Sequence, residues 1–285
     1  MSIAGQKEHL PPWMKVPMIF GKGYSRVNNL IEEHQLNTIC SSGKCPNKSE
    51  CWSAGTATFM ILGDKCTRNC GFCFVTALKP EPVDESEPMR LAKTIKLLEL
   101  KHCVITSVAR DDLKDGGAAF WAETIKTVKE LNPFITMEVL IPDFNGRQEL
   151  LDIIIEAGPE VISHNIETVE RISPRIRSLA TYRRSLDVLD CIAVKGVRAK
   201  SGLMLGLGET YDEVIVAFAD LRRAGVEVLT VGQYLPPSAK HTPLVEYVTP
   251  ELFEKYRLAG LEMGFAHVES GPLVRSSYHA ERHVL

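Results

Sequence analysis

Three cysteines lie close together in KCTRNCGFCF, residues 65–74, at Cys66, Cys70 and Cys73. This spacing would also place them on one face of a helix as buried core residues, but the polar residues and the glycine between them favour a loop. A structural zinc ion is another alternative, although it commonly takes four protein ligands. Three thiolates can instead bind three irons of a 4Fe-4S cube and leave the fourth iron open to a ligand.

A second group of cysteines precedes the first, in CSSGKCPNKSECW, at Cys40, Cys45 and Cys51. Their separations put no two of them on one face of a helix or strand, so core packing does not explain them. A zinc loop or a second iron-sulfur cluster remains. No fourth cysteine is free nearby, because Cys103 and Cys191 lie in apolar segments and are expected to be small core residues.

The composition limits the class of protein. A chain of 285 residues can bury one large core, and its net charge of -3 gives no general attraction to nucleic acid. The first residues, MSIAGQKEHLPPW, carry no targeting pattern, and no apolar run reaches the length that spans a bilayer. We therefore expect a cytoplasmic protein with no membrane partner, in which clustered cysteines stay reduced and act as metal ligands or catalytic groups.

The elements that must position these cysteines alternate along the chain. Apolar, β-branched runs predict strands at 57–62, 103–108, 134–141, 160–166, 198–205 and 227–232. Segments of helical period predict helices at 88–101, 118–131, 147–157, 181–195, 211–224 and 250–262. Residues typical of helix caps mark the ends of several of these helices: Gly158, Gly196 and Gly225 at the C-termini, and Thr210 and Thr249 at the N-termini.

This alternation of strand and helix predicts an α/β fold with a parallel sheet, either doubly wound or closed toward a barrel. In either arrangement, chemistry lies at the carboxyl ends of the strands. We expect a core over 57–264, an N-terminal extension over 1–56 and a C-terminal tail over 265–285. The first triad then lies on the loop after the first strand, and the second triad lies in the extension.

On that loop, Cys66-x3-Cys70-x2-Cys73 resembles the signature of the radical S-adenosylmethionine enzymes. The resemblance implies a partial (β/α)6 TIM-type barrel and a 4Fe-4S cluster whose open iron binds the amino and carboxylate groups of S-adenosylmethionine. One electron then cleaves the sulfonium, and the resulting 5'-deoxyadenosyl radical abstracts hydrogen from carbon. Phe72 matches the aromatic residue that the family places near the adenine, and Met204 lies in GLMLGLGE, which is similar to the fifth-strand motif beside the adenine.

Other contacts to S-adenosylmethionine are expected after the second and fourth strands. ITSVARDDLKDGG replaces the Gly-Gly-Glu that is common in the family, so Ser107, Arg110 and Asp111 are our candidates to hold the methionine ammonium. In SHNIET, Asn165 and Glu167 would lie on one side of an extended segment and could bind a ribose or an amino acid. The alternative is a pair of strand-end residues that satisfy each other.

The second triad, together with VARDDLKDGG, SHNIETV and the terminal RSSYHA, resembles the lipoyl synthase family in particular, over nearly the whole chain. This resemblance implies two 4Fe-4S clusters and insertion of sulfur at C6 and C8 of an octanoyl chain on a carrier lysine. Two S-adenosylmethionine molecules are consumed for each lipoyl group. Sulfur would come from an auxiliary cluster at Cys40, Cys45 and Cys51, and no general acid-base pair is needed.

The resemblance also implies that Ser277 of the terminal motif ligates the fourth iron of the auxiliary cluster. An alkoxide is a harder and more costly ligand for iron than a thiolate, which suits a cluster that is dismantled in the reaction. The alternative for RSSYHAERHVL is a polar tail that frays, with His279 and His283 as surface residues.

The implied partners are an octanoylated lipoyl carrier domain, a low-potential electron donor such as ferredoxin or flavodoxin, and an iron-sulfur cluster carrier. The carrier domain would belong to the E2 subunit of a 2-oxoacid dehydrogenase or to the H protein of glycine cleavage. ERISPRIRSLATYRRS has little acidic compensation, so we expect Arg171, Arg175 and Arg177 to dock an acidic carrier surface. A solvated helix face is the alternative.

Two other functions remain open on the sequence. A methylthiotransferase or a biotin-synthase-like enzyme would share the first triad, but it lacks an N-terminal triad coupled to RSSY. A non-enzymatic iron-sulfur electron carrier or a zinc module would need neither the α/β body nor an open iron.

Overall fold

The computed structural model describes residues 10–16, 19, 21–177 and 179–284. The first nine residues, on which the expectation of no targeting segment partly rests, lie outside this part. In the described residues, no helix is long and apolar enough to cross a membrane.

The central element is an eight-stranded sheet in the order β1-β2-β5-β6-β7-β8-β9-β10. All neighbouring strands from β2 to β10 are parallel, and β1 adds antiparallel to β2. The sheet curves around the molecule without closing, since β1 and β10 are its two edges. The strands are β1 (Asn37–Thr38), β2 (Thr58–Ile61), β5 (His102–Ser107), β6 (Thr136–Leu140), β7 (Val161–Ser163), β8 (Arg198–Leu205), β9 (Val228–Gln233) and β10 (His267–Gly271).

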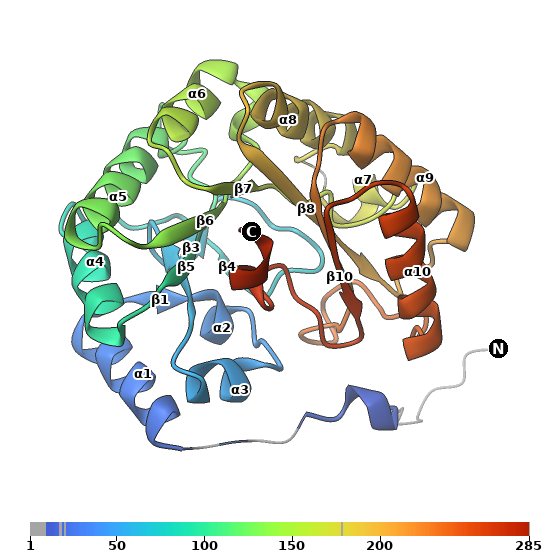
Figure 1. Ribbon diagram of the computed structural model, residues 1–285, viewed down its shortest axis with the longest axis horizontal. Coiled ribbons are helices and arrows are strands. Elements are labelled where there is room, and N and C mark those ends of the chain that lie inside the picture. The colour runs from blue at the N-terminus through green and yellow to red at the C-terminus, as the bar shows by residue number, and fades with distance from the viewer. Residues whose placement is uncertain (1–9, 17–18, 20, 178, 285) are drawn as a thin grey trace.

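Helices cover the outer face of the sheet (Figure 1). Thr210 caps α9 through a capping box with Glu213, and Thr249 accepts the Leu252 N–H at the start of α10. The predicted alternation and the partial barrel are therefore confirmed. The outer helices are α4 (Glu87–Leu98), α5 (Ala118–Leu131), α6 (Gln148–Glu156), α8 (Tyr182–Val194), α9 (Tyr211–Arg223) and α10 (Pro250–Glu262).

Short elements connect or extend this body. They are η1 (Pro12–Met14), α1 (Lys22–Glu33), α2 (Ile39–Ser42), α3 (Lys48–Ser53), β3 (Lys65–Cys66), β4 (Thr76–Ala77), η2 (Phe144–Gly146), α7 (Ser173–Ile176) and η3 (Ala280–His283). In the described residues, the N-terminal extension contributes η1, β1 and the α-helices α1 to α3. Helix α1 lies beside α4 (Figure 1), and α2 contacts β2.

The strands read as nearly continuous apolar runs because both of their faces are covered. Every residue of β2 and of β9 is buried, as expected for a parallel sheet with helices on one side and a filled interior on the other. The interior also holds one fully buried ion pair, in which Lys200 Nζ lies 2.7 Å from Glu138 Oε1.

The C-terminal tail runs through the interior of the partial barrel rather than outside it. It passes so close to β9 that a Cβ on Gly232 would lie 2.1 Å from the Val274 carbonyl oxygen. It then reaches the level of Thr58 and ends in η3, which lies in the middle of the ring of strands (Figure 1). His283 is 1% exposed. The alternative of a frayed tail with His283 on the surface is therefore wrong.

Candidate functional site

The first cysteine triad lies on the loop that follows the carboxyl end of β2. Neighbouring loops hold its backbone: the Thr67 N–H donates to the Ala109 carbonyl (3.1 Å), and the Gly71 N–H donates to the Ile176 carbonyl (2.7 Å). The Gly71 carbonyl in turn accepts from the Thr242 N–H at 2.8 Å, and a Cβ on Gly71 would lie 2.7 Å from Thr242 Oγ1. Glycine is thus required where the cysteine loop is held between two other loops.

The three thiols of this loop lie in a partly buried environment. Burial, with the nearby charge of Cys73 and Glu167, raises the pKa of Cys70 to about 12, and burial raises the pKa of Cys73 to about 11. Cys66 Sγ accepts from the Ala109 N–H at 3.3 Å and from the Arg68 N–H at 3.4 Å. Bound iron would have to displace the thiol protons, and the N–H donors would stabilise the thiolate that results.

Arg68, which lies between the first two cysteines of this triad, holds the cysteine loop in position, and it was not among the site residues expected from the sequence. Its guanidinium lies 2.7 Å from Asp143 Oδ1 and 2.7 Å from Asp111 Oδ1, and its side chain is 7% exposed. Asp111 also accepts from Thr67 Oγ1 at 2.7 Å. The only sequence signal was a charged residue between cysteines, because Asp143 comes from a distant turn.

Asp111 and Arg110, two of the residues expected to hold the methionine ammonium, have other partners in the structure. Both oxygens of Asp111 are engaged by Arg68 and Thr67, so Asp111 holds the cysteine loop in place. Arg110 is 3% exposed and donates to Asp112 at 2.9 Å and to the Leu62 carbonyl at 3.4 Å. A guanidinium is a cation that only donates hydrogen bonds, so Arg110 cannot accept an ammonium.

The other expected contacts lie at the carboxyl ends of β5, β7 and β8. Ser107 Oγ and Asn165 Oδ1 are buried and have no hydrogen-bond partner among the described residues. Asn165 Nδ2 donates to Ser276 Oγ at 2.9 Å. Buried polar atoms without a partner are costly, so Ser107 Oγ and Asn165 Oδ1 fit the binding of a polar ligand at the carboxyl ends of these strands.

Glu167 and Met204 are joined through their backbones. The Met204 N–H donates to the Glu167 carbonyl at 2.8 Å. Glu167 has a φ of 67°, so the segment is not extended there, and the expected alternation with Asn165 does not apply. Burial raises the pKa of the Glu167 carboxyl, while Arg177 and a hydrogen bond from Asn165 oppose that rise.

The expected arginine docking surface needs a correction. Arg177 is 4% exposed, donates to the Asn165 carbonyl at 2.6 Å, and places its charge near Cys70. It belongs to the interior of the site. Arg171 is exposed but pairs with Glu213 at 3.0 Å, and Arg175 is exposed. The positive charge of this segment therefore has more acidic compensation than the sequence indicated, because the partner of Arg171 lies on a different helix, α9.

The second triad is built by the short helices of the N-terminal extension. Cys40 lies in α2, Cys51 lies in α3, and Cys45 lies between them. The Cys45 N–H donates to the Cys40 carbonyl at 3.1 Å, and the Cys51 N–H donates to the Asn47 carbonyl at 2.9 Å. Burial, with the charges of Cys40 and Cys45, raises the pKa of Cys51 to about 12. Three thiols thus share one small, partly buried loop.

The C-terminal tail meets this second triad. Asn47 Nδ2 donates to the Leu273 carbonyl at 2.7 Å, and Tyr278 Oη donates to Glu50 Oε1 at 3.3 Å. Ser277 Oγ accepts from Thr58 Oγ1 at 2.7 Å. Burial raises the pKa of the Cys45 thiol, and the nearby charge of Arg275 opposes that rise. The fold thereby brings RSSY to the triad from more than 200 residues away, since the separation of Thr58 and Ser277 is 219.

The two triads are also neighbours. Lys44, within the second triad, places its Nζ 3.8 Å from the ring centroid of Phe74, directly after the first triad. Phe72 is partly buried and packs against the core. The remaining cysteines stand apart: Cys103 is buried as expected, and Cys191 is half-buried on α8.

The donor atoms of each triad limit what it can hold. A structural zinc ion commonly takes four protein ligands, whereas each triad offers three thiols. Among the described residues, the group of metal-ligating side chains whose ligand atoms all lie within 4.8 Å of one another contains no cysteine. Three thiolates can each bind a different iron of a 4Fe-4S cube, so the donor set of each triad fits such a cluster.

The comparisons with known proteins agree with this geometry. The family model described as the Radical SAM superfamily matches residues 60–230. "Lipoyl synthase" of Flavobacterium psychrophilum is 56% identical over 276 residues, which cover 96% of this chain and 95% of that protein. "Lipoyl synthase" of Parabacteroides distasonis is 57% identical over 279 residues, covering 97% and 99%. "Lipoyl synthase, mitochondrial" of Nematostella vectensis is 56% identical over 279 residues, covering 98% and 96%.

Solved structures share the fold at low identity. Methylornithine synthase superimposes with a TM-score of 0.56 at 14% identity, and the match covers 85% of this chain and 81% of that one. Streptococcus suis SuiB bound to S-adenosylmethionine superimposes with a TM-score of 0.59 at 11% identity, covering 78% and 53%. These likenesses concern the partial barrel alone.

Proposed function

The chain belongs to the lipoyl synthase family, within the radical SAM superfamily, and from this premise we propose that its two cysteine triads hold two 4Fe-4S clusters with different roles. The chain is a sulfurtransferase, so the electron carrier and the zinc module are excluded. When bound, the cluster at Cys66, Cys70 and Cys73 supplies one electron to S-adenosylmethionine, and the auxiliary cluster supplies sulfur.

Residues around the first triad would bind and orient S-adenosylmethionine. Ser107 Oγ and Asn165 Oδ1 are both buried without a partner among the described residues. The Ser107 hydroxyl would donate a hydrogen bond to a polar group of S-adenosylmethionine or accept one from it, and the Asn165 amide oxygen would accept one. Glu167 would receive the methionine ammonium, because a nearby cation compensates a buried carboxylate whose pKa is raised by burial. Phe72 and Met204 would flank the adenine.

Residues of the second triad and the tail would hold the auxiliary cluster. We assign Cys40, Cys45 and Cys51 as its thiolate ligands and Ser277 as its fourth ligand. The observation that carries this proposal is the return of the tail to the triad, through Asn47, Thr58 and Glu50. Thr58 Oγ1 donates to Ser277 Oγ and would stabilise negative charge on it.

The proposed substrate is an octanoyl-lysine on a lipoyl carrier domain, which receives sulfur at C6 and C8 with two S-adenosylmethionine molecules per lipoyl group. Arg175 and Arg171 are proposed to contact that domain, without Arg177. A ferredoxin or flavodoxin would supply electrons, and a cluster carrier would restore the auxiliary site. The cytoplasmic location stays a prediction.

Iron and sulfide analysis of protein purified anaerobically tests the assignment. Two 4Fe-4S clusters give about eight irons per chain. Cys70→Ala should lower this to about four irons and abolish deoxyadenosine formation, whereas Cys45→Ala should lower the iron content equally and leave S-adenosylmethionine cleavage in place. Cys191→Ala is the control and should keep the full content. Zinc without iron, or cleavage at the wild-type rate in Cys70→Ala, would contradict the proposal.

A further inference from the structure

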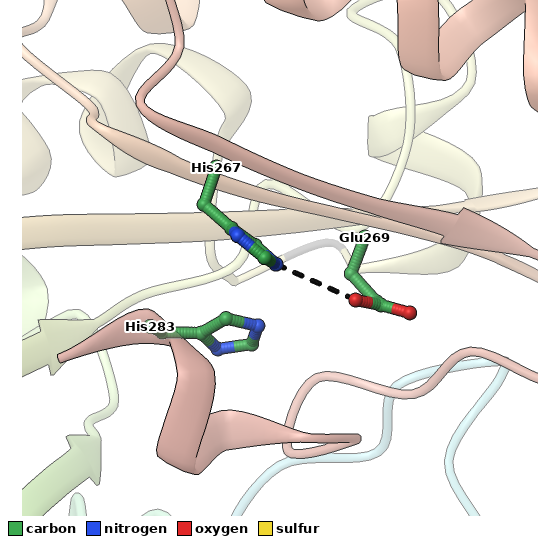
Figure 2. Close-up of side chains that lie close together, drawn as sticks. All are labelled: His267, Glu269 and His283. Atoms are coloured by element: carbon green, nitrogen blue, oxygen red, sulfur yellow. Dashed lines mark hydrogen bonds and ion pairs between the residues drawn. The ribbon is translucent and has the colours of Figure 1, made fainter. Parts of the chain in front are cut away.

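A separate group of ligating side chains lies away from both cysteine triads. His267 opens β10, Glu269 follows two residues later, and His283 lies in η3 at the end of the tail. Figure 2 shows the three side chains turned toward one another, and their ligand atoms all lie within 4.8 Å. His267 Nε2 is 3.4 Å from Glu269 Oε2, and the two imidazole rings have centroids 4.7 Å apart. The first triad follows the carboxyl end of β2, whereas this group begins at the amino end of β10.

One nitrogen of this group lacks any partner. His283 is 1% exposed, and its Nε2 is buried without a hydrogen-bond partner among the described residues. Leaving a buried polar atom unpaired costs about 1–3 kcal/mol. The side chains of His267 and Glu269 are 31% and 21% exposed, so solvent has access to the group from that side. The structure therefore has an imidazole nitrogen without a hydrogen-bond partner next to two partly exposed side chains that can bind a metal ion.

The surrounding charges favour a cation. On the other side of the His283 ring, Nδ1 lies 3.0 Å from Lys200 Nζ and 3.8 Å from Glu138 Oε2. Lys200 is neutralised by Glu138, at 2.7 Å from both of its oxygens. Arg198, which donates to the His283 carbonyl, is paired with Glu227. The carboxylate of Glu269 is therefore left as the excess charge of the group.

We propose that His267, Glu269 and His283 bind a divalent first-row transition-metal ion. Two imidazoles and one carboxylate suit zinc and ferrous iron, with water completing the coordination. His283 would bind through Nε2, so its proton must lie on Nδ1. In the structure Lys200 Nζ lies 3.0 Å from Nδ1, and Glu138 Oε2 lies 3.8 Å from it. With the proton on Nδ1, the contact with Lys200 must give way and the Nδ1–H must approach Glu138, which would make the carboxylate-histidine-metal arrangement found around many bound metals. Lys200 keeps its two bonds to Glu138 in this tautomer.

The ion would act as a cross-link between the tail and the sheet. It would join the last turn of the tail to the first residue of β10, and the intervening chain carries Ser277. A tail held at its far end stays in the barrel interior, where Ser277 contacts Thr58. The site is independent of the cluster assignment, because it contains none of the six cysteines.

Zinc binding by the holoenzyme tests this site. Both clusters are first loaded so that the cysteines are occupied. The protein is then equilibrated with Zn²⁺ and passed over a chelating resin, and its zinc content and unfolding temperature are measured. Wild-type protein should retain one zinc per chain and gain thermal stability from it. His267→Ala should retain none, and Glu269→Gln should bind zinc more weakly by roughly tenfold or more.

His34→Ala is the matched control. His34 follows α1, and it contacts Leu30 and Arg90 through its backbone N–H and carbonyl. The control should bind zinc as the wild type does. The variants use the two partly exposed ligands because loss of the buried His283 could unfold the tail. Equal zinc content in wild type and His267→Ala, or no retained zinc in the wild type, would overturn the proposal.

Discussion

At the scale of the residue, the cysteines could be recognised from the sequence because few structures need three soft ligands in one short loop. The buried arginines could not. Arg177 looks like a surface charge in ERISPRIRS, yet it donates to the Asn165 carbonyl and lies beside Cys70. Arg68 pairs with Asp143, which lies 75 positions further along the chain. Such partners are fixed by the packing of distant loops and leave no local pattern.

Ser277 offers a prediction at this scale. Ser277→Cys should still assemble the auxiliary cluster, because a thiolate is the better ligand for iron. The stronger ligand should hold its iron longer and so slow sulfur insertion, while deoxyadenosine formation continues. Iron content and product formation in single-turnover assays measure both effects.

Ser276→Cys is the matched control, since Ser276 contacts Asn165 rather than Thr58. It should leave the lability of the auxiliary cluster unchanged. If Ser277→Cys inserts sulfur at the wild-type rate, or if Ser276→Cys alone stabilises the cluster, Ser277 is not the fourth ligand.

At the scale of the element, the strands and helices with local signals were predicted with ends that differ from those of the structure by at most three residues, as in 88–101 against α4 and 160–166 against β7. The helices at 118–131 and 250–262 match α5 and α10 at both ends. The two edge strands were missed for physical reasons. β1 has only two residues, and β10, HVESG, buries only Val268 and carries polar side chains on both faces. Neither shows the apolar run or the alternation that marks a strand.

The start of α4 gives a pH prediction. Burial raises the pKa of Glu87 from 4.5 to about 7, and its carboxyl accepts from the Leu62 N–H, next to the cysteine loop. A raised pKa means that the folded state binds this proton more tightly than the unfolded chain. The contribution of Glu87 to stability is therefore fully present below 4.5 and is lost as the pH rises through about 7.

Glu87→Gln removes this titration and keeps an oxygen for Leu62. The difference in unfolding free energy between wild type and Glu87→Gln should therefore shift against the wild type as the pH rises from 4.5 to about 7. Denaturant titrations at several pH values measure it. A difference that stays constant over this range would contradict the raised pKa.

Helix α7 carries the remaining docking prediction. Arg175 is exposed there, and charge reversal should weaken long-range attraction to an acidic carrier domain. Arg175→Glu should lower the association rate of the octanoylated domain by roughly tenfold at low ionic strength and by less at high ionic strength. Stopped-flow binding measures these rates.

Lys126→Glu, an equal change of charge on the exposed face of α5, is the control and should have a small effect. An association rate that does not depend on salt, or that falls equally in the two variants, would contradict docking of the carrier domain at Arg175.

At the scale of the whole molecule, the two terminal segments complete the barrel. The N-terminal extension supplies three cysteines and a strand at one edge of the sheet, and the tail supplies β10 at the other edge before it enters the interior. The sheet therefore continues across the expected boundaries at 57 and 264, and the division into three segments stays a prediction. RSSY meets the second triad because the two terminal segments come together in the fold, and hydrophobic periodicity could not predict that contact.

The central claim is that the cluster at Cys40, Cys45 and Cys51 is the sulfur donor. The direct measurement is the isotope content of the product made by enzyme reconstituted with iron and sulfur-34 sulfide, assayed anaerobically without added sulfide or cluster carrier. The account predicts lipoyl product that carries the label in both sulfur atoms and reaches a plateau at or below one equivalent per chain, because one auxiliary cube is used up. Unlabelled product, or many turnovers without an added sulfur source, would contradict it.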